Sequence, residues 1–63
     1  MGEYKFELYR DTTDEYRWRF LAPNGNITAM SSESYKNKAD CEAAIRALRL
    51  EAKAAAIYDL SKN

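Results

Sequence analysis

The chain has 63 residues, 46% hydrophobic and 13% aromatic, and its ten basic residues balance ten acidic ones. This length predicts one domain over residues 1–63, and the apolar content excludes a disordered chain. The lack of histidine and the single cysteine, Cys41, exclude Cys/His zinc sites, Ser-His-Asp triads and an intramolecular disulfide. The zero net charge argues against a DNA-coating protein. No apolar run is long enough to span a membrane, so we expect a cytoplasmic protein.

Two segments near the N-terminus, residues 4–9 and 16–22, alternate apolar and polar residues. This period of two, with many aromatics, predicts half-buried strands. The polar residues 11–15 between them predict a hairpin loop. The segment Pro23–Asn26 contains Asn-Gly, which tolerates positive φ at both positions and so predicts a type I′ turn. A third antiparallel strand should then follow over about residues 27–31.

Pairing the strands about these turns sets one register, with Leu8 opposite Trp18 and Phe20 between Phe6 and Ala29. One face of the sheet, called the inner face, then carries Tyr4, Phe6, Leu8, Tyr16, Trp18, Phe20, Ile27 and Ala29. The opposite, outer face carries Lys5, Glu7, Tyr9, Arg17, Arg19, Leu21, Thr28 and Met30. A slip of one residue would turn the inner aromatics toward water, so the register should be well specified.

A helix is predicted after the strands, with Asn37 as N-cap and Asp40 completing a weak capping box. Apolar residues recur along one side of this helix at Cys41, Ala44, Ile45, Leu48 and Ala52. These small side chains would let the helix lie close to the large aromatics of the sheet, in a second layer. From the pattern alone, residues 57–60 either continue the helix or form a short fourth strand.

Certain motifs occur together over nearly the whole chain: Phe6–Asp11, Glu15–Arg19, Asn24-Gly25, Ile27, Ala29, Ser31, Glu33, Tyr35, Lys38, Ile45, Ala55, Ile57 and Asp59. This combination resembles the YegP-like family of small uncharacterised domains. The resemblance implies an α+β fold with a three-stranded antiparallel meander, one helix and a short C-terminal strand (β-β-β-α-β). It therefore favours a strand at residues 56–59. It also implies that single-copy members dimerise, and it supplies no catalytic residue.

The family usually has glycine where this chain has Ser34. Glycine at that position suggests a backbone with positive φ. The sequence therefore leaves the conformation of the 32–36 loop open.

One candidate binding surface is a cluster on the predicted outer face: Lys5, Tyr9, Arg17 and Arg19. Its cations could contact nucleic-acid phosphates while the tyrosine stacks on a base. The alternative is an ordinary solvated face, in which Glu7 pairs with Arg19 across the strands. In that case Tyr9 would stack on Arg17. The balanced charge favours the solvated face.

A second candidate surface is the predicted helix start, with Tyr35, Lys36 and Lys38. Free backbone N–H groups at a helix start bind anions, and the two lysines add positive charge. Glu33 opposes this, so an ordinary capped helix entry is favoured. Cys41 follows on the core side of the helix, where a small buried hydrophobe is favoured over a reactive thiol.

The function best supported by these patterns is a non-enzymatic homodimer that acts as a structural or interaction module. We predict no catalytic residue, cofactor or metal, and the sequence identifies no other protein partner. A second copy would cover the long, aromatic edge strands of a small sheet, and the outer apolar residues Tyr9, Leu21 and Met30 are an alternative contact. Weak nucleic-acid binding through Lys5, Arg17 and Arg19, and anion or small-molecule binding near residues 35–38, are the alternative functions.

Overall fold

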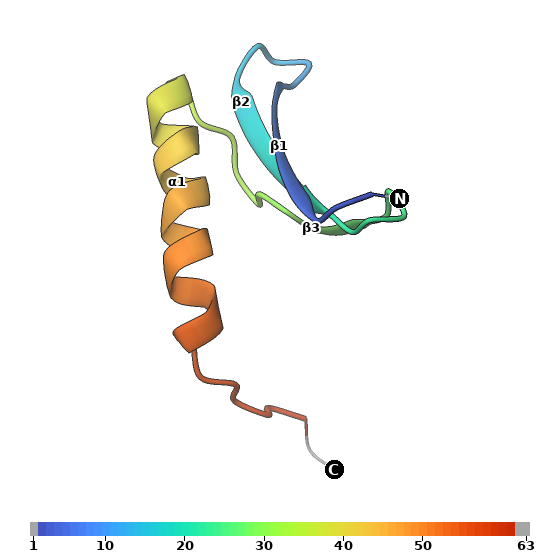
Figure 1. Cartoon of the computed structure of the whole chain (residues 1–63). Helices are drawn as coiled ribbons and strands as arrows, with labels where there is room; N and C mark the ends of the chain where they lie inside the picture. The colour runs from blue at the N-terminus through green and yellow to red at the C-terminus, as the bar shows by residue number, and fades with distance from the viewer. Residues whose placement is uncertain (1, 62–63) are drawn as a thin grey trace.

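A computed structural model describes residues 2–61 as a sheet and a helix in two layers (Figure 1). The sheet contains β1 (Lys5–Arg10), β2 (Tyr16–Leu21) and β3 (Ile27–Met30), paired antiparallel in the order β1-β2-β3. Helix α1 (Lys38–Glu51) follows and ends in one 3₁₀ turn, η1 (Ala52–Ala54). The predicted α+β class, the meander and the helix are confirmed.

The predicted register of β1 with β2 is confirmed, as is that of β2 with β3 up to Phe20; beyond Phe20 the predicted placing of Ile27 and Thr28 is wrong. The observed pairs include Phe6–Phe20, Glu7–Arg19, Leu8–Trp18, Tyr9–Arg17, Phe20–Ala29 and Arg19–Met30. A register shift after Phe20 pairs Leu21 with Ile27 and leaves Thr28 as the extra residue of a bulge. Leu21 is buried, so the outer contact patch predicted with Tyr9 and Met30 loses this member.

The two hairpin loops, residues 11–15 and 22–26, share one design. In the first loop the N–H of Asp14 donates to the carbonyl of Asp11 at 3.0 Å, and the N–H of Asp11 donates to the carbonyl of Glu15 at 2.8 Å. In the second loop Gly25 donates to Ala22, and Ala22 donates to Asn26, both at 2.9 Å. The fourth residue has a positive φ, 65° at Asp14 and 90° at Gly25. The predicted type I′ turn is wrong because Asn24 keeps a negative φ: a β-turn followed by one left-handed residue closes the loop.

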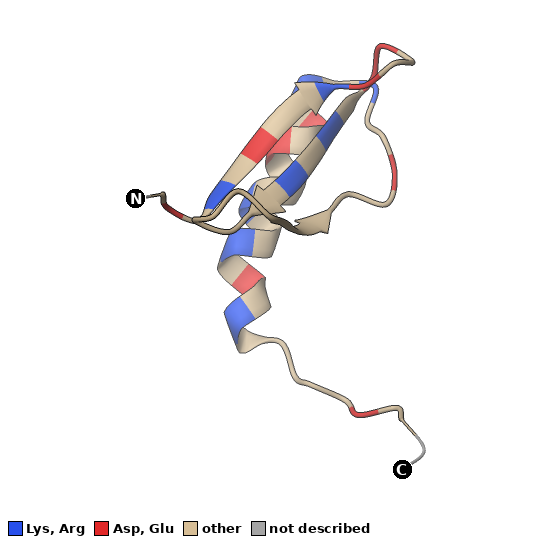
Figure 2. Ribbon diagram, turned by 90° about the vertical axis from the view of Figure 1, so that its right-hand side faces the viewer, with Lys and Arg blue, Asp and Glu red and all other residues tan. Residues whose placement is uncertain are grey.

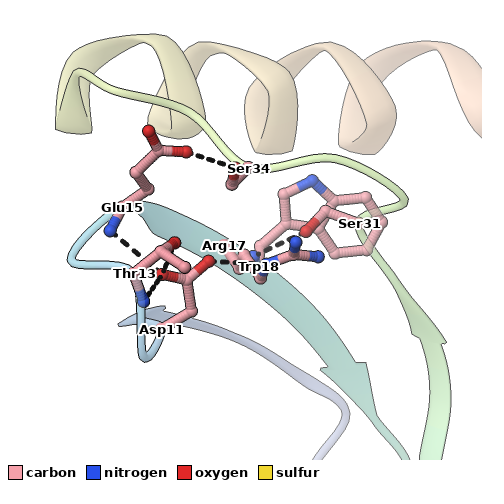
Figure 3. A network of polar contacts seen from close by, with 7 residues as sticks. All are labelled: Asp11, Thr13, Glu15, Arg17, Trp18, Ser31 and Ser34. Carbon is pink, nitrogen blue, oxygen red and sulfur yellow. Dashed lines mark hydrogen bonds and ion pairs between the residues drawn. The ribbon is translucent and has the colours of Figure 1, made fainter.

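Serine side chains tie the connection from β3 to α1 to β2 at Trp18 and to the first hairpin loop at Glu15 (Figure 3). The N–H of Ser31 donates to the carbonyl of Trp18 at 2.9 Å, and the Trp18 N–H donates to Ser31 Oγ at 3.2 Å. Ser34, which has no positive φ, donates its hydroxyl to the carboxylate of Glu15. A side-chain hydrogen bond thus holds the 32–36 loop whose conformation the sequence left open.

Helix α1 begins where the sequence predicts, with Asn37 as its N-cap residue. The Asn37 side chain does not bond the helix backbone, and its amide reaches Asp40 Oδ2 only at 3.4 Å, so the predicted capping box is not formed. Cys41 is completely buried. Burial raises the pKa of its thiol, which opposes the reactive-thiol alternative.

The hydrophobic core of a single copy is small. Within residues 2–61, Leu21 and Cys41 are the only buried hydrophobic residues. The inner aromatics contact one another, with Phe6 lying 4.7 Å from Phe20 and 5.7 Å from Trp18 between ring centroids, but all three stay half-buried. Helix α1 contacts β1 and β2 and leaves β3 uncovered.

The strand predicted at residues 56–59 is not formed. Residues 55–61 are exposed and outside any helix or strand of the described chain. Helix α1 carries this segment past the end of the sheet (Figure 1), so it lies away from both sheet edges of its own copy. The helical alternative for residues 57–60 is also excluded.

The overall shape is extended for so short a chain. Its radius of gyration is 13.7 Å, whereas about 10.6 Å is typical of a compact chain of this length. Its accessible surface is 5428 Å², against about 4,200 Å² for a folded monomer of this mass. The excess, roughly 1,200 Å², exceeds what one partner contributes to a standard protein interface.

Candidate interaction surfaces

The outer face of the sheet brings Lys5, Tyr9, Arg17 and Arg19 together, but its cations already have partners. Glu7 accepts Arg19 Nε at 2.7 Å and lies 3.5 Å from Lys5 Nζ. The guanidinium of Arg19 lies 4.7 Å from the centre of the Tyr9 ring. Tyr9 therefore stacks on Arg19 and not on Arg17, which is its backbone partner.

Arg17 is held instead by the first hairpin loop. Asp11 Oδ2 accepts Arg17 Nε at 2.8 Å, while Asp11 Oδ1 accepts the N–H and the hydroxyl of Thr13 and the N–H of Glu15 (Figure 3). The Thr13 hydroxyl, followed by the Arg17 guanidinium, holds the pKa of Asp11 well below its usual range. Asp11 therefore holds the first hairpin loop in shape, a role that the sequence analysis missed. An aspartate at the first position of a turn often makes such hydrogen bonds, so its position could have indicated the role.

Charge on this face is therefore balanced locally. Hydrogen bonding from Arg19 lowers the pKa of Glu7, so its carboxylate is ionised at neutral pH. Figure 2 shows acidic residues interspersed with basic ones over the sheet and the helix. A phosphate approaching the outer face would compete with carboxylates that lie within 3.5 Å of each cation.

The helix start holds Tyr35, Lys36 and Lys38 in a different setting. Tyr35 exchanges backbone hydrogen bonds with Tyr16, at 2.7 and 2.8 Å, which fastens the connection to the start of β2. Lys36 and Lys38 are exposed. Nothing in residues 2–61 joins these residues to the outer-face cluster into one site.

A third surface, which the sequence analysis missed, is a groove between the inner face and the C-terminal half of α1. One hollow of about 400 Å³ is lined by Phe6, Phe20, Ala29, Leu48, Arg49, Ala52 and Lys53. A neighbouring hollow of about 380 Å³ is lined by Tyr4, Lys5, Phe6, Phe20, Ile45 and Arg49. They share three residues and form one groove with an aromatic floor and a basic rim; we call it the inner groove.

No helix within residues 2–61 is long and apolar enough to cross a membrane. No group of three metal-ligating side chains lies together in the same part of the chain.

Comparison with known proteins places the chain among uncharacterised proteins. A family model described as a domain of unknown function (DUF1508) matches residues 11–59. UPF0339 protein Atu0232 of Agrobacterium fabrum is 47% identical over 58 residues, 92% of each chain. A UPF0339 protein of Methanosarcina acetivorans is 40% identical over 89% of this chain and 95% of its own.

A solved structure shares the fold. The NMR solution structure of a protein from Haloferax volcanii matches with a TM-score of 0.82 at 36% identity. The match covers 94% of this chain and 98% of that chain. The relatives and the solved structure are therefore similar over almost their whole length.

Proposed function

The chain belongs to the DUF1508 family of domains of unknown function, and on this premise we propose that it works as a non-enzymatic homodimer, a structural or interaction module. Membership agrees with the resemblance to YegP-like domains seen in the sequence. In this proposal the folded and working unit is the pair, it acts in the cytoplasm, and each copy contributes residues 1–63 as one domain.

One observation carries the proposal: the inner aromatic face is only half covered. Phe6, Trp18 and Phe20 stay half-buried, and β3 has no helix above it. Burying a large side chain stabilises a protein by about 1.5–3 kcal/mol. A second copy laid on this face would supply the missing cover for several of them.

The proposal is tested by light scattering on a size-exclusion peak over a wide concentration range. We expect twice the mass of the 7.3 kDa chain, and a thermal midpoint that rises with protein concentration, because dissociation and unfolding are linked. A monomer mass at every concentration would overturn the proposal.

The nucleic-acid and anion alternatives have a separate test. Filter binding with single-stranded DNA at low salt should show no tight complex, since the outer cations already bind carboxylates. Tight binding with a steep salt dependence, reduced in Arg17→Ala and Arg19→Ala, would favour nucleic-acid binding instead. Chemical shifts moved by phosphate at residues 33–38 would favour an anion site.

A further inference from the structure

The basic residues of the chain differ in whether they have an acidic partner. The ion pairs of residues 2–61 all lie in the sheet and the first hairpin loop. Toward the end of α1 and in η1, Arg46, Arg49 and Lys53 are exposed and form no ion pair within the described part of the chain. Their charge is therefore available to an anionic partner, whereas that of the outer face is already neutralised.

These cations lie along one side of the helix. Residues three, four or seven positions apart in a helix are neighbours on its surface. This spacing brings together four residues, which we call the helix patch: Arg46, Arg49, Leu50 and Lys53. Glu51 lies two positions from both Arg49 and Lys53, so it faces away from them. Glu42, one turn before Arg46, marks the end of the patch.

Leu50 gives the helix patch an apolar centre. Its side chain is 74% exposed, and with Arg46 and Arg49 it lines a surface hollow of about 240 Å³. This volume is below the roughly 300–1,000 Å³ of a small-molecule pocket, and it suits a single side chain. An apolar centre with a charged rim is the usual arrangement of a contact between proteins.

The helix dipole accounts for only part of the patch. It favours cations in the last turn of a helix, which explains Arg49 and, in the following 3₁₀ turn, Lys53. Arg46 lies more than one turn before the C-cap residue Ala52, beyond the reach of this effect. The dipole also gives no reason for an exposed Leu50.

We propose that the helix patch binds an acidic segment of another protein, whose carboxylates pair with the cations while an apolar side chain lies on Leu50. This inference rests on the proposed role as an interaction module and names the chemistry of the partner. Arg46 and Leu50 line neither hollow of the inner groove. This part of the patch therefore stays open when a second copy covers the groove.

An acidic peptide fits the helix patch better than a nucleic acid does. A nucleic acid presents phosphates but no apolar side chain to cover Leu50. The described residues that line the hollow include no aromatic ring on which a base could stack. The chain also has no net charge, so its long-range attraction for a polyanion is weak. A peptide that carries both carboxylates and an apolar residue matches every member of the patch.

The first test measures binding of a labelled synthetic peptide, a run of glutamates with one central leucine, to the full chain by fluorescence anisotropy. A contact of this small size should give a dissociation constant of about 100 μM. Replacing the leucine of the peptide by serine should weaken binding about tenfold. Added salt should weaken it as well, because the ion pairs are exposed.

Variants of the chain locate the contact. Leu50→Ser should weaken peptide binding about tenfold, whereas its control Met30→Ser, at a residue 55% exposed on the sheet, should stay within about twofold. Arg46→Ala should weaken binding about threefold, as for an exposed ion pair. Lys38→Ala, which removes an exposed cation at the other end of α1, should have no such effect.

A charge reversal gives a gain of binding. A chain with both Arg46→Glu and Lys53→Glu should lose affinity for the glutamate peptide and acquire it for a matching lysine peptide with the same central leucine. Both residues are exposed, so the fold should be retained, which circular dichroism checks. Failure of the reversed chain to prefer the lysine peptide would contradict the inference.

The outcomes separate this inference from the homodimer. No binding of the glutamate peptide, or binding unchanged in Leu50→Ser and Arg46→Ala, would overturn the helix patch as a docking site, while a dimer mass in light scattering would still support the homodimer. A single-stranded oligonucleotide that binds more tightly than the peptide, and is weakened by Arg46→Ala, would replace the acidic protein by a nucleic acid. A monomer mass with normal peptide binding would overturn the homodimer alone.

Discussion

The two faces of the sheet differ in how much of their chemistry one copy completes. On the outer face each of Lys5, Arg17 and Arg19 has a carboxylate within 3.5 Å. On the inner face the aromatics are half-buried and border an open groove. Charged side chains on neighbouring strands can pair with one another within the sheet. Apolar side chains are removed from water only when another layer of the protein packs over the whole face. One copy therefore leaves its inner face only half covered, and this is the face that the proposed homodimer would cover.

The largest expected effect comes from removing an inner-face ring. Phe20→Ala should lower the free energy of unfolding by about 3 kcal/mol, because Phe20 contacts Phe6 and Tyr4 and borders both hollows. Urea unfolding followed by Trp18 fluorescence measures it. The outer-face control Met30→Ala should lower the free energy of unfolding by no more than about 0.5 kcal/mol. Equal decreases for the two variants would show that the two faces do not differ in this way.

The next effect tests the second layer. Cys41→Ser should lower the free energy of unfolding by about 2 kcal/mol, because the completely buried thiol would be replaced by a hydroxyl in an apolar site. Thermal unfolding by circular dichroism measures the loss. Cys41→Ala separates polarity from lost volume and should cost less. A serine variant as stable as the wild type would show that this site admits water.

A smaller effect is expected in the hairpin loops, which belong to neither face. Gly25→Ala should destabilise by about 1 kcal/mol, because Gly25 has φ 90° and the added methyl would meet no atom within 4 Å. The cost is thus one of backbone conformation. Asp14, with φ 65°, holds the equivalent position but already carries a Cβ. Asp14→Ala should therefore cost less than Gly25→Ala and lose chiefly the exposed ion pair with Arg10, 2.6 Å long. The urea midpoints of Gly25→Ala and Asp14→Ala, each compared with the wild type, measure the two losses of stability.

The smallest effect concerns Asp11 of the first hairpin loop, which holds Arg17 of the outer face, and it depends on pH. The folded-state pKa of Asp11 is lowered, so its carboxylate stabilises the fold fully above its ordinary pKa, about 3.9. That contribution is lost as pH falls through the lowered value. The urea midpoint of Asp11→Asn should therefore fall less than that of the wild type between about pH 5 and pH 2. Glu33→Gln, an exposed control, should follow the wild type.

Prediction from sequence succeeded where the pattern is local. Alternation over residues 4–9 and 16–22 fixed strands and register, because a slip would expose Phe6, Trp18 and Phe20. The prediction failed in the turn at residues 22–26. Asn24 and Gly25 both tolerate a positive φ, but this tolerance does not show that only Gly25 adopts one. The predicted stacking partner of Tyr9 was also wrong, because Asp11, the residue directly after β1, binds the Arg17 guanidinium and Arg19 stacks on Tyr9 instead.

The amino-acid sequence by itself determined the meander, the helix and the apolar character of residues 57–60. Only the tertiary structure decided that α1 leaves β3 uncovered, that an inner groove stays open, and that the C-terminal segment points away from its own sheet. The physical reason is that periodicity specifies which side of an element is apolar. The direction in which a helix leaves its layer, and hence which apolar side stays uncovered, depends on contacts between residues far apart in the chain.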